Sequence, residues 1–130
     1  MIELDVWLDG IVSTCALIAE DGLFERVWLN GDVTITSIMN PDELFEQIFD
    51  DLDAENYIDT LSNEKIIDNN FLSLIRSFLV ALAKFEKKYD EGKDNSDLVI
   101  MLRSTEWGAL KSSAAEVVKY SRDTLMRSDK

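Results

Sequence analysis

Apolar residues recur every three or four positions along most of the chain, which is the spacing of one face of an α-helix. The first stretch with this spacing covers residues 4–19, and Asp5 can cap its start. Residues 20–22 interrupt the pattern, which resumes over residues 23–28. We therefore predict a well-buried first helix followed by a short second helix.

Residues 27–37 allow two interpretations. Asn30-Gly31 between β-prone residues is typical of a tight β-hairpin. The helical spacing of the preceding apolar residues instead favours a helix that ends at Gly31 and is followed by a loop. We favour the helix and loop and keep the hairpin as the alternative.

The clearest helix start in the chain is Asn40-Pro41-Asp42-Glu43. It combines an asparagine cap, proline at the first helical position and glutamate three residues after the cap. The helix should reach Leu52, and a short helical piece should follow over residues 53–58. Residues 61–68 are polar and are predicted to form a loop.

The longest helix of the chain should begin at Asn69 or Asn70 and reach about Tyr89. Its apolar residues cover more than one face, which predicts a helix at the centre of the domain. Residues 98–102 fit either a short helix or a strand. Ser104 or Thr105 should cap a last helix, which we expect to fray from residue 122. The sequence thus predicts an all-α, single-domain bundle over residues 1–130, with five or six helices around a central helix at about 69–89.

Composition narrows the chemistry. The 130 residues are 46% hydrophobic, enough for one buried core. Cys15 is the only cysteine, so a disulfide within the chain is impossible, and histidine, the commonest general base and metal ligand, is absent. The acidic start does not resemble a signal peptide, and no apolar run approaches the roughly 20 residues that span a bilayer. We expect a soluble cytoplasmic protein.

Charge is distributed very unevenly along the chain. Residues 1–64 carry 16 carboxylates and one basic residue, Arg26, whereas residues 65–130 carry 10 carboxylates and 12 lysines or arginines. The whole chain has a net charge of −13. Self-repulsion of this kind opposes folding, so it suggests either a strongly solvated surface or a surface that meets a basic partner.

The helix after Pro41 concentrates this charge. At about 100° per residue its carboxylates share one face and its apolar residues another. Acidic residues four positions apart repel, and the helix contains no lysine or arginine to offset the repulsion. The face is either solvated or binds a basic partner. It comprises Asp42, Glu43, Glu46, Asp50 and Asp53, and Asp51 belongs to the same acidic segment.

A second candidate contact is the region that joins Trp28 to small polar residues, among them Asp32 and Ser37. Loops of this composition often carry recognition. The alternative is that Trp28 belongs to the core and that the polar residues form turns and caps.

Other chemistry has weaker support. The carboxylates of residues 50–55 lack the glycine and glutamate spacing of an EF-hand, and no phosphate loop or nucleophile motif is present. Direct nucleic-acid binding is opposed by the charge. We expect no metal, no cofactor and no catalysis. A metal-dependent hydrolase built on residues 50–55 is one alternative, and a scaffold protein whose acidity serves solubility is another.

Several short motifs resemble a family of small acidic bacterial proteins. They are Trp28-Leu29-Asn30-Gly31, Ser37, the acidic segment over residues 42–53, and Glu106-Trp107 ahead of Ala114-Ala115. In size and acidity the chain is also similar to the immunity proteins of bacterial polymorphic-toxin and contact-dependent inhibition systems. That similarity implies a cytoplasmic inhibitor that binds a cationic toxin domain, often a nuclease, and blocks its nucleic-acid site.

Overall fold

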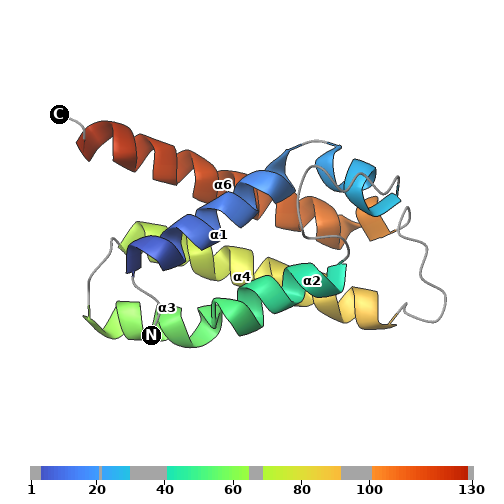
Figure 1. The fold of residues 1–130 in the computed structure, drawn as a ribbon, viewed down its shortest axis with the longest axis horizontal. Coiled ribbons are helices and arrows are strands. Elements are labelled where there is room, and N and C mark those ends of the chain that lie inside the picture. Colours follow the sequence, from blue (N-terminus) through green and yellow to red (C-terminus); the bar gives the residue numbers. More distant parts are fainter. Residues whose placement is uncertain (1–3, 21, 30–40, 65–68, 92–100, 129–130) are drawn as a thin grey trace.

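The computed structural model describes residues 4–20, 22–29, 41–64, 69–91 and 101–128, and 93% of this part is helical with no strand (Figure 1). The predicted all-α bundle is confirmed, with six helices when α2 and η2 are counted as one. The elements are α1 (Leu4–Ala19), the π-helical η1 (Glu25–Leu29), α2 (Pro41–Phe45), the π-helical η2 (Glu46–Asp51), α3 (Ala54–Glu64), α4 (Asn69–Glu91) and α6 (Thr105–Ser128).

The helices pack against one another in a closed ring around one core. α1 packs on α6, α6 packs on α4, and α4 packs on α2 and α3 (Figure 1). Trp7 of α1 completes the ring, because its side chain stacks on Tyr57 of α3 with centroids 4.6 Å apart and its Nε1 donates a hydrogen bond to the Leu52 carbonyl at 2.9 Å. Gly10 permits this approach, since a Cβ there would lie 3.1 Å from Leu52 Cδ2.

α4 is the central helix that the sequence predicts. It contacts α2, α3 and α6, and its innermost side chains are completely buried. Burial of apolar area on this scale is the main favourable term in folding. The fully buried residues of α4 are Ile75, Phe78, Leu82 and Phe85. The expectation that α4 is the longest helix was wrong, because α6 has 24 residues and α4 has 23.

Local predictions had mixed outcomes. Val27 and Trp28 are buried in η1, which confirms the helix over the hairpin up to Leu29, while residues 30–37 lie outside the described part. The loop predicted at residues 61–68 was wrong for residues 61–64, because these residues continue α3 to Glu64, while residues 65–68 lie outside the described part.

The last helix begins where the sequence predicts. The Ser104 hydroxyl accepts a hydrogen bond from the Trp107 backbone N–H at 3.1 Å, which satisfies a donor that has no partner within the helix. The backbone of α6 is helical to Ser128, and the expected fraying from residue 122 stays a prediction. Of the short segment before it, Met101 and Leu102 are helical, and residues 92–100 lie outside the described part.

Cys15 lies in the core of the bundle. Cys15 is completely buried, and burial raises the pKa of its thiol far above the ordinary value, so it is a core side chain rather than a nucleophile.

None of the helices in the described ranges has the length and apolar character that crossing a membrane requires.

Phe78 tests the central position of α4. Phe78→Ala removes a completely buried ring and leaves a cavity, so we expect the free energy of unfolding to fall by about 3–5 kcal/mol in urea titrations followed by circular dichroism. Lys87→Ala, an exposed change on the same helix, should cost less than about 0.5 kcal/mol. A loss below about 1 kcal/mol for Phe78→Ala would place α4 at the periphery.

Trp7 tests the closure of the ring. Trp7→Phe removes the buried hydrogen bond to the Leu52 carbonyl, whereas Trp107 Nε1 is buried without a hydrogen-bond partner among the described residues. Trp107→Phe is therefore a matched control that removes a similar area and no hydrogen bond. We expect Trp7→Phe to be the more destabilising by about 1–2 kcal/mol in the same titrations. Equal losses would show that the Trp7 hydrogen bond contributes nothing to closure.

Candidate functional site

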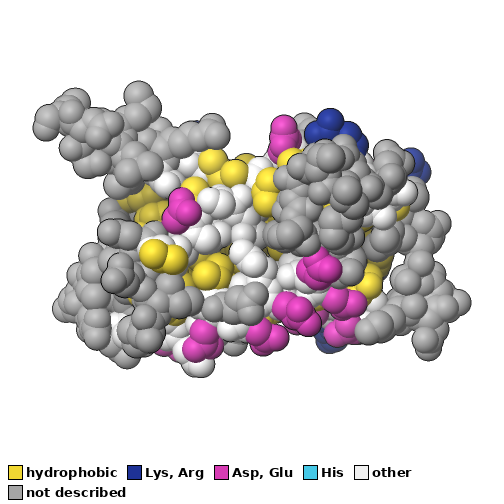
Figure 2. All heavy atoms as spheres, in the orientation of Figure 1, with side chains coloured by type: hydrophobic (Ala, Val, Ile, Leu, Met, Phe, Trp, Pro, Cys, Tyr) yellow, Lys and Arg dark blue, Asp and Glu magenta, His cyan; other side chains and the backbone are white. Residues whose placement is uncertain are grey.

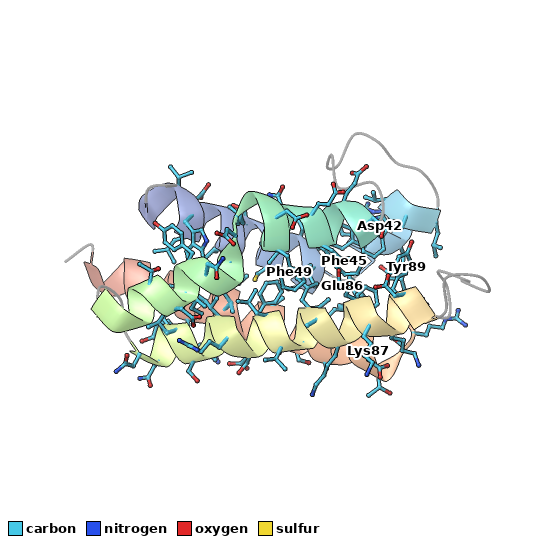
Figure 3. All side chains as sticks on the ribbon, turned by 90° about the horizontal axis from the view of Figure 1, so that it is seen from below. Asp42, Phe45, Phe49, Glu86, Lys87 and Tyr89 are labelled. Carbon is cyan, nitrogen blue, oxygen red and sulfur yellow. The ribbon has the colours of Figure 1, made fainter. Side chains whose placement is uncertain are left out.

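A shallow hollow of about 300 Å³ opens between the continuous α2–η2 helix and α4. Its floor is aromatic and its rim is acidic. Figure 3 shows Phe45, Phe49 and Glu86 between the two helices, whereas Lys87 points away from them. We call this feature the acidic hollow, defined by Asp42, Phe45, Glu46, Phe49, Asp50 and Glu86.

The rim belongs to a larger acidic edge of the molecule. Figure 2 shows Asp and Glu side chains gathered along the side formed by α2, η2 and α3. Asp42, Glu46 and Asp50 are exposed there, and Glu86 is half-buried at the junction with α4. The structure therefore brings three of the predicted carboxylates together and adds a fourth from a different helix.

A continuous series of aromatic rings supports the floor of the hollow. Phe45 is only 5% exposed, and its centroid lies 6.0 Å from that of Phe85 and 5.9 Å from that of Tyr89. The Trp107 ring follows, with its centroid 5.1 Å from Phe85. Each of these rings is held by its neighbours, so the Phe45 part of the floor belongs to the packed core, and the half-buried Phe49 packs against that core.

The π-helical geometry of η2 corrects the sequence analysis. The Leu52 N–H bonds to the Gln47 carbonyl, five residues earlier, at 3.1 Å. A π-helix holds more residues in each turn than an α-helix, so a constant 100° per residue misplaces the side chains after Phe45. Short π-helical segments occur frequently at functional sites, and this one carries two of the rim carboxylates, Glu46 and Asp50.

Nothing in the sequence distinguishes the π-helix from an α-helix. Phe45, Ile48 and Leu52 are all buried, and their spacing of three and four residues is the ordinary spacing of an α-helix, so it gives no sign of the π-helical turn. The register is instead a property of the folded state, in which Leu52 packs against Gly10 and its carbonyl accepts the Trp7 hydrogen bond.

Glu86 is the rim residue that the sequence analysis missed. It lies among Lys84, Lys87 and Lys88 near the end of α4, where cations favour the negative end of the helix dipole. A helical projection of α4 would have identified Glu86 from the sequence. At about 100° per residue, Glu86 falls near Leu82 on the apolar face and well away from Lys84. An acidic residue beside the apolar stripe indicates a carboxylate at an interface between helices.

Asp53 has a structural task at the start of α3. Its φ of 45° lies in the left-handed region, which aspartate tolerates better than most residues. Its Oδ1 accepts a hydrogen bond from Asn56 Nδ2 at 3.0 Å, and its carbonyl accepts the Tyr57 N–H at 3.0 Å. Asp53 thus makes the turn between η2 and α3 and does not line the acidic hollow.

Two further carboxylates of the predicted face stand apart from the hollow. Glu43 is half-buried and is not among the residues that line it. Asp51 ends η2, and its side chain lies outside the described part of the structure. The described site is therefore narrower than the face that the sequence predicts.

Trp28 belongs to the aromatic series rather than to the surface. It is 8% exposed, stacks on Phe24 with centroids 4.4 Å apart and lies 5.6 Å from Trp107. This burial favours the core interpretation of Trp28 over a partner contact. Asp32 and Ser37, the other candidates in that region, lie outside the described residues.

The acidic hollow combines carboxylates with aromatic side chains, and this limits the ligands that it suits. A bound metal requires ligands that converge on one point, and across the described ranges no set of three or more Asp, Glu, Cys or His residues is placed to hold one. Carboxylates spread around an aromatic floor instead suit a planar guanidinium, which bonds to carboxylates at its edge and stacks on rings with its face.

Comparison of the chain with models of known protein families, with curated proteins and with solved structures finds no match. The function therefore has to be argued from the geometry and charge of this chain.

Proposed function

We propose that the protein is an inhibitory binding protein that captures a basic partner in the acidic hollow, as an immunity protein against a cationic toxin. The observation that carries the proposal is the meeting of four carboxylates from two helices over a packed aromatic floor. None of the described residues that line the hollow is basic.

The part of the chain that supplies most of the rim has no basic residues. Residues 27–64 contain no lysine or arginine, so the rim carboxylates have no basic neighbour along α2, η2 or α3. Like charges held close together oppose folding. A partner that brings its own lysines and arginines relieves this repulsion and gains charge-assisted hydrogen bonds.

The aromatic floor favours arginine over lysine in the partner. An arginine that enters the hollow can bond to Asp42, Glu46 or Asp50 through its edge while its face lies on Phe49. A lysine ammonium is a compact point charge and, unlike the planar guanidinium, cannot stack on an aromatic ring. The stacking contributes about 0.5–1 kcal/mol at an exposed site.

A toxin that acts on nucleic acid offers the required surface. Its substrate groove is lined with basic side chains that bind phosphates, and a cluster of carboxylates on rigid helices can occupy the same side chains. Long-range attraction between the two surfaces would also accelerate their encounter. Inhibition then follows from occupation of the groove and needs no chemistry in this protein.

Charge reversal in the hollow tests the proposal. With a basic nuclease domain found by pull-down from a panel of such domains, Glu46→Lys together with Asp50→Lys should slow association and abolish inhibition of the nuclease. The difference from the wild type should shrink as salt rises, because screening removes the long-range attraction. Stopped-flow measurements of the association rate at several salt concentrations give this difference between the variant and the wild type.

The matched control for this variant changes the same net charge elsewhere. Asp9 and Glu20 of the α1 region are exposed, and Asp9→Lys with Glu20→Lys should leave inhibition intact and reduce the association rate far less. Both double variants should be as stable as the wild type. Equal effects of the two variants would contradict a local site and favour a generally solvated acidic surface.

The floor yields a separate prediction. Phe49→Leu keeps an apolar side chain on η2 but removes the aromatic face, so we expect the dissociation constant for the nuclease to rise about two- to fivefold. The loss should disappear in a nuclease whose entering arginine is replaced by lysine. Unchanged binding by Phe49→Leu would remove the aromatic floor from the recognition mechanism.

A further inference from the structure

A second surface lies between α4 and α6, where a groove of about 610 Å³ runs along the outside of the bundle. Val80 stands in this groove and is 54% exposed, a large exposed fraction that only Val6 and Leu29 share among the large hydrophobic residues of the described part. Around it the lining is made of small side chains: Ser73, Ser77 and Ala81 from α4, and Ala109 and Ser113 from α6.

The groove faces away from the acidic hollow. At about 100° per residue, Glu86 projects from α4 nearly opposite Ser77 and Lys84. Glu86 lines the hollow and the other two line the groove. Occupation of the groove therefore leaves the acidic hollow free.

The two walls of the groove carry opposite charges. Arg76 and Lys84 line it from α4, and Glu106 lines it from α6. Within one chain, Lys88 Nζ already lies 3.9 Å from Glu106 Oε1. Lys84 precedes Lys88 by one helical turn, so Lys84 lies within about 6 Å of the height of Glu106 along the groove. Arg76 is partly engaged with Asp59 of α3 at 3.6 Å, which leaves Lys84 as the main cation of the α4 wall.

Because its two walls carry opposite charges, the groove is electrostatically complementary to the same groove on a second copy of the chain. A twofold axis that runs along the groove sets α4 of one copy on α6 of the other at equal height. Lys84 of each copy then meets Glu106 of the other, and Val80 of each copy meets the small side chains of the opposite wall. A twofold axis across the helices would instead set α4 on α4 and bring Lys84 against Arg76, which like-charge repulsion disfavours.

We propose that the α4–α6 groove is a self-association surface through which two copies of this chain form a twofold dimer, with α4 of each copy on α6 of the other. The arrangement turns two helix pairs into a four-helix interface around the two Val80 side chains. It directs the two acidic hollows outward, so each copy keeps its own site for a basic partner. The dimer does not depend on the function proposed for the hollow.

Sedimentation velocity of the purified full chain over about 1 µM to about 1 mM tests the proposal, because twofold interfaces of modest size dissociate in this range. We expect the mass of two chains at the upper end and of one chain for Val80→Asp, with unchanged circular dichroism. A wild-type chain that is monomeric at every concentration overturns the proposal.

A charge swap tests the pairing across the axis. Lys84→Glu alone and Glu106→Lys alone should each weaken the dimer by about tenfold, because each places like charges together twice, and the double variant should restore it. Arg26→Glu, an exposed change on η1, should leave the dimer unchanged. A dimer that survives both single reversals and Val80→Asp forms through another surface and overturns the assignment.

Discussion

The fold depends on the need of α4 to bury apolar side chains around much of its circumference. Leu79 and Ala81 project from nearly opposite sides of α4 and are both buried, so no single neighbouring helix can cover them both. α6 covers one side, and α2 and α3 cover the other. This arrangement leaves α4 with one exposed strip, which carries Lys84 and Val80, and with one edge against α2, at which Glu86 lies.

The acidic hollow follows from that packing. Its floor is the outermost part of the aromatic series, since Phe45 packs on Phe85 and Tyr89 while Trp107 supports Phe85 from within. Its rim stands on helices anchored by these rings. Charges that are fixed before binding lose little conformational entropy when a partner arrives, which favours recognition by a small number of contacts. Repulsion between the rim carboxylates lowers the free energy of unfolding, and the burial of the aromatic rings beneath them offsets this loss.

Most of the helical pattern could be predicted from the sequence, because caps and apolar spacing are local signals. The starts at Pro41, Asn69 and Ser104 all agree with the structure. The π-helical turn of η2 could not be predicted, since its apolar spacing is that of an α-helix and its register depends on Trp7 and Gly10, more than 35 residues away. The three carboxylates of α2–η2 were found as a group for the same local reason, whereas Glu86 joins them only through tertiary packing.

The central claim is that the acidic hollow is a specific receptor for arginine-rich surfaces. Nuclear magnetic resonance of the isotope-labelled protein, titrated with a short arginine-rich peptide, tests it most directly, with a lysine-rich peptide of equal charge as the control. The account predicts amide shifts concentrated on Asp42, Glu46, Asp50 and Glu86, with tighter binding of the arginine peptide. Equal affinity for both peptides, with shifts spread over all acidic surfaces including Asp9 and Glu20, would contradict it.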